Sequence, residues 1–241
     1  MKNILIAVFL LTTLPFFSIG QTENSSENVA YAFGVNFASE LNYRTLKVGN
    51  EYQLSQPWEE YKYAQDSAAF WKWGFSTGAN FSVIWNKKSQ LQLGLNYSNN
   101  GYQTFDKEII NDTMGFFHDY RYKLNYEYLE IPLKFKYYIG QGTVTFNGTA
   151  GIIPKILIRA TTHKTQTNVT DMYTSQVYDN NARQFNVSYF VGAGLNINFS
   201  NNSMLSIEPS ISSSLASVDH NSNQKAFLWN SGIGIHYQVR I

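Results

Sequence analysis

The sequence predicts an all-β fold: a single eight-stranded antiparallel up-and-down transmembrane β-barrel with short periplasmic turns and long extracellular loops. Three observations predict it: an export signal at the N-terminus, eight segments of alternating hydrophobicity, and connections that alternate between short and long. Successive side chains of a strand point to opposite faces, so alternation gives a wall with an apolar outside and a polar inside. Such a wall suits a barrel that has lipid around it and a polar lumen.

The first residues have the features of a secretory signal peptide. Lys2 supplies a positive charge, residues 4–11 form an apolar run, and residues 18–20 are a small-residue cleavage site before Gln21. The alternative is an N-terminal transmembrane helix, which needs about 20 apolar residues and therefore a longer run than this one. We expect three parts: a signal peptide (1–20), a short periplasmic segment (21–28) and an outer-membrane β-barrel domain (29–241).

The composition also favours a strand-built membrane protein. Aromatic residues make up 16% of the chain and charged residues only 15%, whereas soluble domains carry about 25% charged residues. A soluble lectin-like sandwich is the alternative that composition leaves open. The chain has no cysteine, which excludes disulfides, thiolate–zinc sites and cysteine nucleophiles. Its net charge of +1 gives no reason to expect nucleic acid as a partner.

Eight segments alternate with period two. In one of them Trp71, Trp73 and Phe75 take one face, and Lys72 and Gly74 take the other. Large apolar residues opposite small or polar ones are typical of a strand that faces lipid. The predicted strands are 31–44, 71–85, 91–98, 129–139, 144–152, 187–199, 205–212 and 232–241.

The connections between these segments alternate in length. Those at 86–89, 140–142 and 200–203 are short and rich in residues that tolerate positive φ. The others are long and polar, at about 47–68, 106–119, 160–183 and 218–225. Outer-membrane barrels have this asymmetry, which a soluble sandwich has no reason to show. The first strand must also pair with the last, because an open sheet edge in lipid is very costly.

One segment resembles a known family. The run Tyr126–Tyr138, YEYLEIPLKFKYY, is similar to a strand motif of the PorT-like outer-membrane β-barrel family, and a looser likeness covers residues 29–241. The resemblance implies an outer-membrane barrel, and some members of that family are tied to a protein-secretion apparatus. Because the motif marks a strand, the resemblance assigns no catalytic or binding residue.

The inward faces of the predicted strands carry charge. Buried charges must be paired or hydrogen-bonded, so we favour an ion-paired network that fills a barrel too narrow to conduct. The alternative is a narrow pore or a small-solute-binding barrel. The residues expected in this lumen network are Glu40, Arg44, Glu130, Lys134, Lys136, Lys155, Arg159, Glu208, His236 and Arg240.

Three prolines fall within the predicted strands. Proline cannot donate to a strand ladder and belongs at an edge or a bulge. Pro132, Pro154 and Pro209 nevertheless lie inside strands of a closed barrel. We therefore expect a local bulge near Pro132. The alternative is that each proline falls where its backbone nitrogen would not pair.

Histidines are the candidates for acid–base chemistry. His118-Asp119 and Asp219-His220 lie in or beside long loops, as does His163. These pairs suggest a rim-located hydrolase as an alternative function, but no nucleophile motif flanks them. Together with Asp112, Asp171 and Asp179 they have no recognisable metal-ligand spacing. We therefore expect no catalytic residue, metal or cofactor.

The predicted loops are rich in aromatic side chains, which suits either partner binding or an upper aromatic girdle at the lipid headgroups. We interpret the protein as a non-enzymatic scaffold or interaction module of the cell envelope, with outer-membrane lipid and envelope or secretion proteins as partners. The sequence leaves the oligomeric state open. The loop aromatics are Tyr52, Trp58, Tyr61, Tyr63, Phe116, Phe117, Tyr173 and Tyr178.

Overall fold

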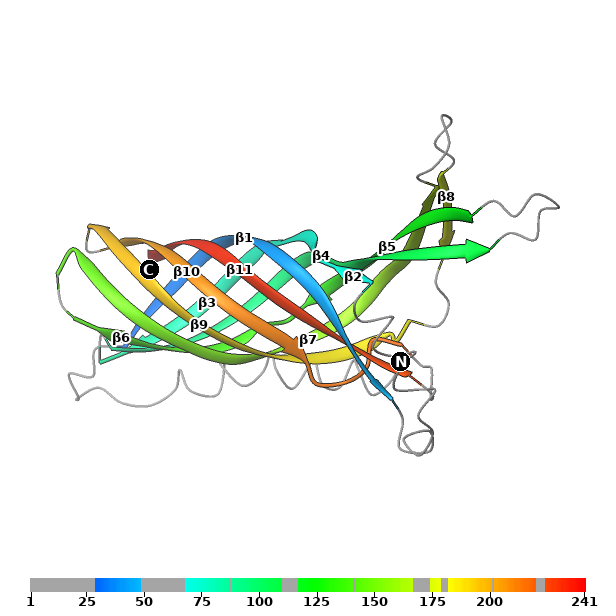
Figure 1. The fold of residues 1–241 in the computed structure, drawn as a ribbon. Coiled ribbons are helices and arrows are strands. Elements are labelled where there is room, and N and C mark those ends of the chain that lie inside the picture. The colour runs from blue at the N-terminus through cyan, green and yellow to red at the C-terminus, as the bar shows by residue number, and fades with distance from the viewer. Residues whose placement is uncertain are drawn as a thin grey trace, which may run out of the picture.

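Strands wind around a common axis to form a barrel, and some of them run on past one end of it (Figure 1). The computed structural model describes residues 29–48, 68–86, 88–109, 117–140, 142–166, 174–178, 182–200, 202–219 and 224–241. Its strands are β1 (Val29–Val48), β2 (Ala69–Phe70), β3 (Lys72–Trp85), β4 (Ser89–Ile109), β5 (Phe117–Glu130), β6 (Leu133–Ile139), β7 (Val144–Gln166), β8 (Thr174–Tyr178), β9 (Phe185–Ser200), β10 (Ser203–Ser214) and β11 (Gln224–Arg240). Within these residues no helix is long and apolar enough to cross a membrane.

The strands close into an eight-membered antiparallel ring, which confirms the predicted fold class. Going round it, β1 pairs with β3, β3 with β4, β4 with β5 and β6, and these two with β7. β7 then pairs with β9, β9 with β10, and β10 with β11. The first strand then pairs with the last, from Ala32 opposite Arg240 to Val48 opposite Gln224. Neither strand is left with an open edge in lipid, where unpaired backbone groups would be costly.

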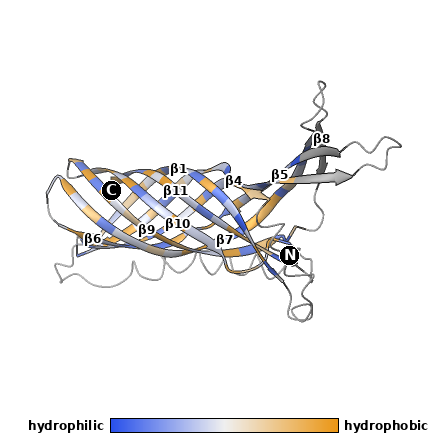
Figure 2. Ribbon diagram, viewed as in Figure 1, coloured by the Kyte–Doolittle hydropathy of each residue, from blue (hydrophilic) through white to orange (hydrophobic). Residues whose placement is uncertain are grey.

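The two faces of the wall differ as the alternation predicts. Phe33 is 54% exposed and its neighbour Ala32 only 1%, because adjacent side chains of a strand lie on opposite faces. Hydrophobic and hydrophilic residues accordingly alternate along the ribbons (Figure 2). Trp73 and Trp229 are exposed where the barrel approaches its loop end, and Tyr137 and Tyr237 near its short-turn end. These are the two aromatic girdles that border the lipid band.

The short turns have the predicted backbone. Asn86 has a φ of 54°, and Gly140 and Gly142 have φ values of 95° and 107°. Only glycine, and occasionally asparagine, adopts such conformations at little cost. The three short connections lie together at one end of the barrel, near β6 (Figure 1).

Two of the predicted long loops are wrong in extent. β4 and β5 pair as far as Ile109 opposite Phe117, and β5 and β7 as far as Tyr120 opposite Gln166, with β8 paired to β7 beyond the ring. We call this projection, formed by the outer parts of β4, β5 and β7 together with β8, the extracellular arm (Figure 1). It forms because tyrosine-rich alternation continues along β5 past the membrane, where strand pairing remains favourable.

The predicted bulge at Pro132 is wrong. The register against β4 is the same on both sides of the proline, from Asn96 opposite Glu130 to Leu93 opposite Leu133. The Pro132 carbonyl accepts a hydrogen bond from the Gly94 N–H at 2.9 Å, so proline costs one ladder bond without shifting the strand. A Cβ at Gly94 would lie 2.8 Å from the proline ring, so glycine leaves room for it.

The bulge lies in β7 instead. Glu127 is opposite Arg159 and Tyr128 is opposite Leu157, so Ile158 has no partner on β5. An extra residue in one strand reverses the facing of the residues beyond it. This changes which side chains of the upper β7 enter the lumen.

Candidate functional site: the filled lumen

The lowest layer of the lumen, near the short turns, is a network of uncharged polar groups. Gln238 Nε2 donates to Asn80 Oδ1 at 3.0 Å and to Ser82 Oγ at 3.3 Å. Gln90 Nε2 donates to Ser82 Oγ at 2.7 Å, and the Tyr138 hydroxyl donates to Gln90. Four strands contribute to this layer, so their inward residues meet only in the closed barrel.

The middle layer contains a buried cluster around Glu208 of β10. Lys136 Nζ of β6 lies 2.9 Å from Glu208 Oε2, and both side chains are almost fully buried. The same oxygen accepts from Thr149 Oγ1 at 2.7 Å and from Asn147 Nδ2 at 3.2 Å. His236 Nε2 lies 3.6 Å from Oε1. The ion pair and both hydrogen bonds of this carboxylate are therefore on Oε2, and Oε1 accepts no hydrogen bond from the described residues.

Lys134 lies next to this cluster and finds a different partner. Its Nζ is 3.6 Å from the centre of the Phe190 ring, within the range of a cation–π interaction. Glycines on β9 leave space for these side chains, since a Cβ at Gly192 would lie 3.2 Å from Glu208 Cγ.

A second cluster surrounds Glu130 of β5. Lys155 Nζ lies 2.8 Å from Glu130 Oε1, and Ser98 Oγ donates to the same oxygen at 2.7 Å. Asn100, with its carboxamide oriented to satisfy both neighbours, donates to Glu40 at 3.2 Å and accepts from Lys155 Nζ at 3.2 Å. The two clusters thus contain two ion pairs, Lys136–Glu208 and Lys155–Glu130. Lys134 lies beside the first pair, and Asn100 links Glu40 to the second.

The other three expected lumen residues lie outside this layer, and one of them is not in the lumen. Arg44 is buried in the upper lumen, 4.5 Å from the ring centre of Tyr102. Arg240 lies on the inward face of β11 at its short-turn end and is half-buried. The expectation that Arg159 points into the lumen is wrong, because its side chain is 49% exposed and pairs with Glu127 on the outer face. The bulge at Ile158 turns it outward, which period-two counting across β7 does not include.

An apolar layer, which we call the tyrosine cap, closes the loop end of the lumen. Its aromatic members are Tyr102, Tyr126 and Tyr128, whose exposed fractions are 4%, 1% and 2%. Tyr126 packs against both of the others, with ring centres 6.4 and 6.3 Å apart. Such low exposure means that these rings and their neighbours fill the space. The remaining members are Leu46, Ala160, Ala182, Val218, Ala226 and Leu228.

Segments from two connections cover the cap. Ala182 and Asp219 form an isolated β-bridge, and the Arg183 N–H donates to the Val218 carbonyl at 2.7 Å. The Tyr126 hydroxyl donates to Asp219 Oδ1 at 3.3 Å. These contacts hold the two connections over the rings of the cap.

Sequence reasoning missed the cap although a signal was present. Tyr126 and Tyr128 have the same parity as Glu130, which was expected to point inward. Counting two more pairs back along β5 would therefore have placed both rings in the lumen. Tyr102 was harder to predict, because it follows Gly101, whose φ of 142° marks an irregular backbone.

Most of the residues considered for catalysis, metal binding or loop recognition lie outside the described side chains. This applies to His118, Asp119 and His220 and to the loop aromatics. His163 is described and lies on β7 opposite Lys123. Among the described residues no group of three or more His, Cys, Asp or Glu could hold a metal ion. The polar residues that the structure does bring together are those of the packed lumen.

Comparison with known proteins agrees with the closed antiparallel ring. A family model described as "Outer membrane protein beta-barrel domain" matches residues 20–216. The chain belongs to this family. The protein is therefore an outer-membrane β-barrel, and its location is the outer membrane. No curated protein matches the chain.

Several solved structures of this family's architecture resemble the chain weakly. Neisserial surface protein A has 12% identity and a TM-score of 0.38, over 85% of this chain and 97% of that one. The outer-membrane protease OmpT of Escherichia coli has 11% identity and a TM-score of 0.43, over 92% and 100%. The attachment invasion locus protein Ail of Yersinia pestis has 12% identity and a TM-score of 0.32, over 85% and 97%.

Proposed function

We propose that this outer-membrane barrel is a non-enzymatic anchor that presents its extracellular arm to a protein partner in the cell envelope or outside the cell. The observation that carries the proposal is the length of the strands. β7 has 23 residues, whereas about 10 residues cross a membrane. The excess is folded as a paired sheet, which offers a partner a preformed surface beyond the bilayer.

The lumen supports an anchoring role over a transport role. The charged layer and the tyrosine cap occupy the lumen at two successive levels, and side chains in both are almost inaccessible to solvent. An eight-stranded barrel has room for little more than its own side chains. Purified protein in planar lipid bilayers should give no discrete openings, and stepwise ion conductance would overturn this part of the proposal.

The arm can be tested by site-specific photo-crosslinking in intact cells. A crosslinking residue at Lys123 would lie on the exposed face of the arm, and one at Gly148 on the lipid-facing barrel wall serves as the control. We expect a discrete protein adduct from the arm position that the wall position does not give. Adducts of equal yield from both positions, or no protein adduct from the arm, would contradict the proposal.

The resemblance of Tyr126–Tyr138 to the PorT-like family adds a narrower proposal, that the partner belongs to a protein-secretion apparatus. Identification of the crosslinked protein tests it directly. An adduct to a protein unconnected with secretion would remove this narrower proposal and leave the arm's role intact.

The absence of catalysis is also part of the proposal. Among the described residues, Asp219 bonds to the Tyr126 hydroxyl and closes the cap, which is a structural use for one member of the His–Asp pairs. Peptide and phospholipid hydrolysis should be undetectable in the purified protein. Turnover that disappears in His118→Ala or His220→Ala, with the folded protein retained, would show an enzyme instead.

A further inference from the structure

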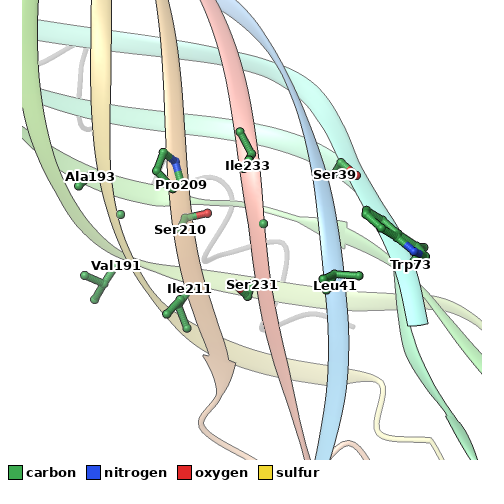
Figure 3. A pocket seen from close by; sticks show the side chains of 12 residues that line it. Ser39, Leu41, Trp73, Val191, Ala193, Pro209, Ser210, Ile211, Ser231 and Ile233 are labelled. Carbon is green, nitrogen blue, oxygen red and sulfur yellow. The ribbon is translucent and has the colours of Figure 1, made fainter. Parts of the chain in front are cut away.

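The lipid-facing wall of the barrel has a hollow on the side of β9, β10, β11 and β1. Its volume is about 710 Å³, and its lining is almost entirely apolar. Small outward residues, Ser39, Ser231 and Ala193, form its floor with Pro209, and Trp73 and Val191 are among the larger side chains around it (Figure 3). Pockets of this volume accommodate an organic ligand, and this hollow is open toward the surrounding lipid.

The height of the hollow places it in the outer half of the membrane. Strands of such barrels tilt by about 35–45° and rise about 3.4 Å per residue. Trp73 lies 12 residues along β3 from its end at Trp85, close to the outer aromatic girdle. The hollow is therefore at the level of the acyl chains of the outer leaflet.

Above the hollow, the outer faces of β1 and β11 carry aromatic rings. Tyr43 is opposite Trp229, and Thr45 is opposite Phe227. Trp71 packs beside Tyr43 with ring centres 5.2 Å apart. Rings at this position occupy the level of the lipid headgroups, directly between the hollow and the extracellular ends of the two strands.

The next outward pair is a pair of like charges. Lys47 is directly opposite Lys225, and both side chains are exposed. Like charges that face each other across strands destabilise a sheet. The Lys47 ammonium lies over the Phe227 ring at 5.0 Å, and the described outer faces of β1 and β11 contain no carboxylate. The pair therefore presents two positive charges without an anion from either strand.

The hollow, the rings and the lysine pair form one continuous column. Leu41 and Ser231 at the hollow are each six residues from Lys47 and Lys225, which is about 20 Å along the strands. With the strand tilt, the lysines are about 15 Å farther out along the membrane normal. We propose that this column binds one phosphorylated, multiply acylated glycolipid of the outer leaflet, with acyl chains in the hollow and phosphate on the lysine pair.

Each part of the column matches one part of such a lipid. A hydrocarbon chain fills the apolar hollow, the sugar lies against the rings, and the phosphate accepts hydrogen bonds from two ammonium groups. A second copy of the chain fits less well, because two lysine pairs would be brought together at the interface. The site lies on the barrel wall and is independent of the partner proposed for the arm.

Native mass spectrometry of the detergent-solubilised protein tests the proposal, with diphosphoryl lipid A as the probe. We expect a one-to-one adduct, and weaker binding by roughly thirtyfold in the Lys47→Gln/Lys225→Gln variant. The matched control is Arg121→Gln/Lys123→Gln, which removes the same charge from the exposed face of β5. It should weaken binding by less than about threefold.

The hollow is tested by a second matched pair. Ala193→Leu fills the floor of the hollow and should weaken binding by roughly tenfold. Ala79→Leu makes the same change on the outer face of β3, where Val35 and Leu95 are its neighbours, and should leave binding unchanged. Both substitutions point outward, and heat-modifiable migration on gels verifies that each barrel folds.

Several results would overturn the proposal. One is an equal loss of lipid binding in Lys47→Gln/Lys225→Gln and in Arg121→Gln/Lys123→Gln, which would show general charge attraction. Others are equal binding of dephosphorylated lipid A or phosphatidylglycerol, displacement by millimolar inorganic phosphate, or no adduct at all. A dimer that Ala193→Leu abolishes would assign the hollow to a second copy of the chain.

Discussion

Replacing Glu208 with glutamine removes one charge from the middle layer of the lumen and keeps the shape of the side chain. The Glu208 carboxylate lies 2.9 Å from the Lys136 ammonium, and both side chains are almost fully buried. Glutamine retains an oxygen that can accept from Thr149 and Asn147. The substitution therefore isolates the ion pair from the hydrogen bonds around it.

The expected loss follows from the distance and the burial. At 2.9 Å two unit charges attract by about 6 kcal/mol at an effective dielectric constant of about 20. Desolvation offsets part of this attraction in the native pair, but Glu208→Gln leaves the Lys136 ammonium buried without its counterion. Such a change costs about 3–5 kcal/mol of unfolding free energy.

The assay is equilibrium unfolding of the barrel by urea in lipid vesicles, followed by tryptophan fluorescence. A paired variant, Lys136→Met/Glu208→Leu, removes both charges and should lie within about 2 kcal/mol of the native protein, because no unpaired charge remains. Arg159→Gln serves as the control, since its guanidinium is half exposed on the outer face. It should cost about 1 kcal/mol or less.

Either of two results would contradict a role for the Lys136–Glu208 pair in stability. A loss below about 1 kcal/mol in Glu208→Gln would mean that water or another group compensates the Lys136 charge. A paired variant less stable than Glu208→Gln would mean that the charges themselves, and not their pairing, stabilise the lumen.

Three further predictions concern the packing of the wall and the cap. Gly94→Ala should cost about 1–3 kcal/mol of unfolding free energy, because its Cβ would meet the proline ring opposite. Gly148→Ala is the control, since Gly148 has open space around it, and it should gain about 0.5 kcal/mol. Equal effects of the two substitutions on urea unfolding would contradict this prediction. Tyr126→Ala/Tyr128→Ala should cost about 3 kcal/mol or more, yet planar bilayers should stay non-conducting because the charged layer below is intact; discrete openings would show that the cap alone seals the lumen. Deleting Ile158 removes the bulge and reverses the facing of upper β7, so the heat-modifiable band should be lost; a stable folded band would mean that the bulge is dispensable.

Much of the lumen could be predicted by counting. Glu130, Lys134 and Lys136 share one face of a single alternating segment, and the structure buries all three. Their partners could not be predicted, because Lys136 meets Glu208 only when β6 and β10 face each other across the closed ring. The sequence separates such residues widely, and no local rule pairs them.

Two of the wrong predictions, a bulge at Pro132 and an inward Arg159, have a common physical origin. In each case a single residue interrupts a regular strand. Pro132 looked like a bulge, but its carbonyl still accepts from Gly94 and the register continues. Ile158 looked regular, but it has no partner and turns Arg159 outward. Whether a strand absorbs an irregularity or shifts is decided by the two neighbouring strands, whose spacing and contacts are tertiary.

The sequence by itself therefore determined the number of membrane strands, their lipid-facing sides and the short turns, while the export signal stays a prediction. These properties depend on period-two alternation and turn chemistry, which act over a few residues. Only the tertiary structure decided the ion pairing, the tyrosine cap and the column from the hollow to Lys47 and Lys225. Each of these joins side chains from different strands, and ring closure and register bring them together.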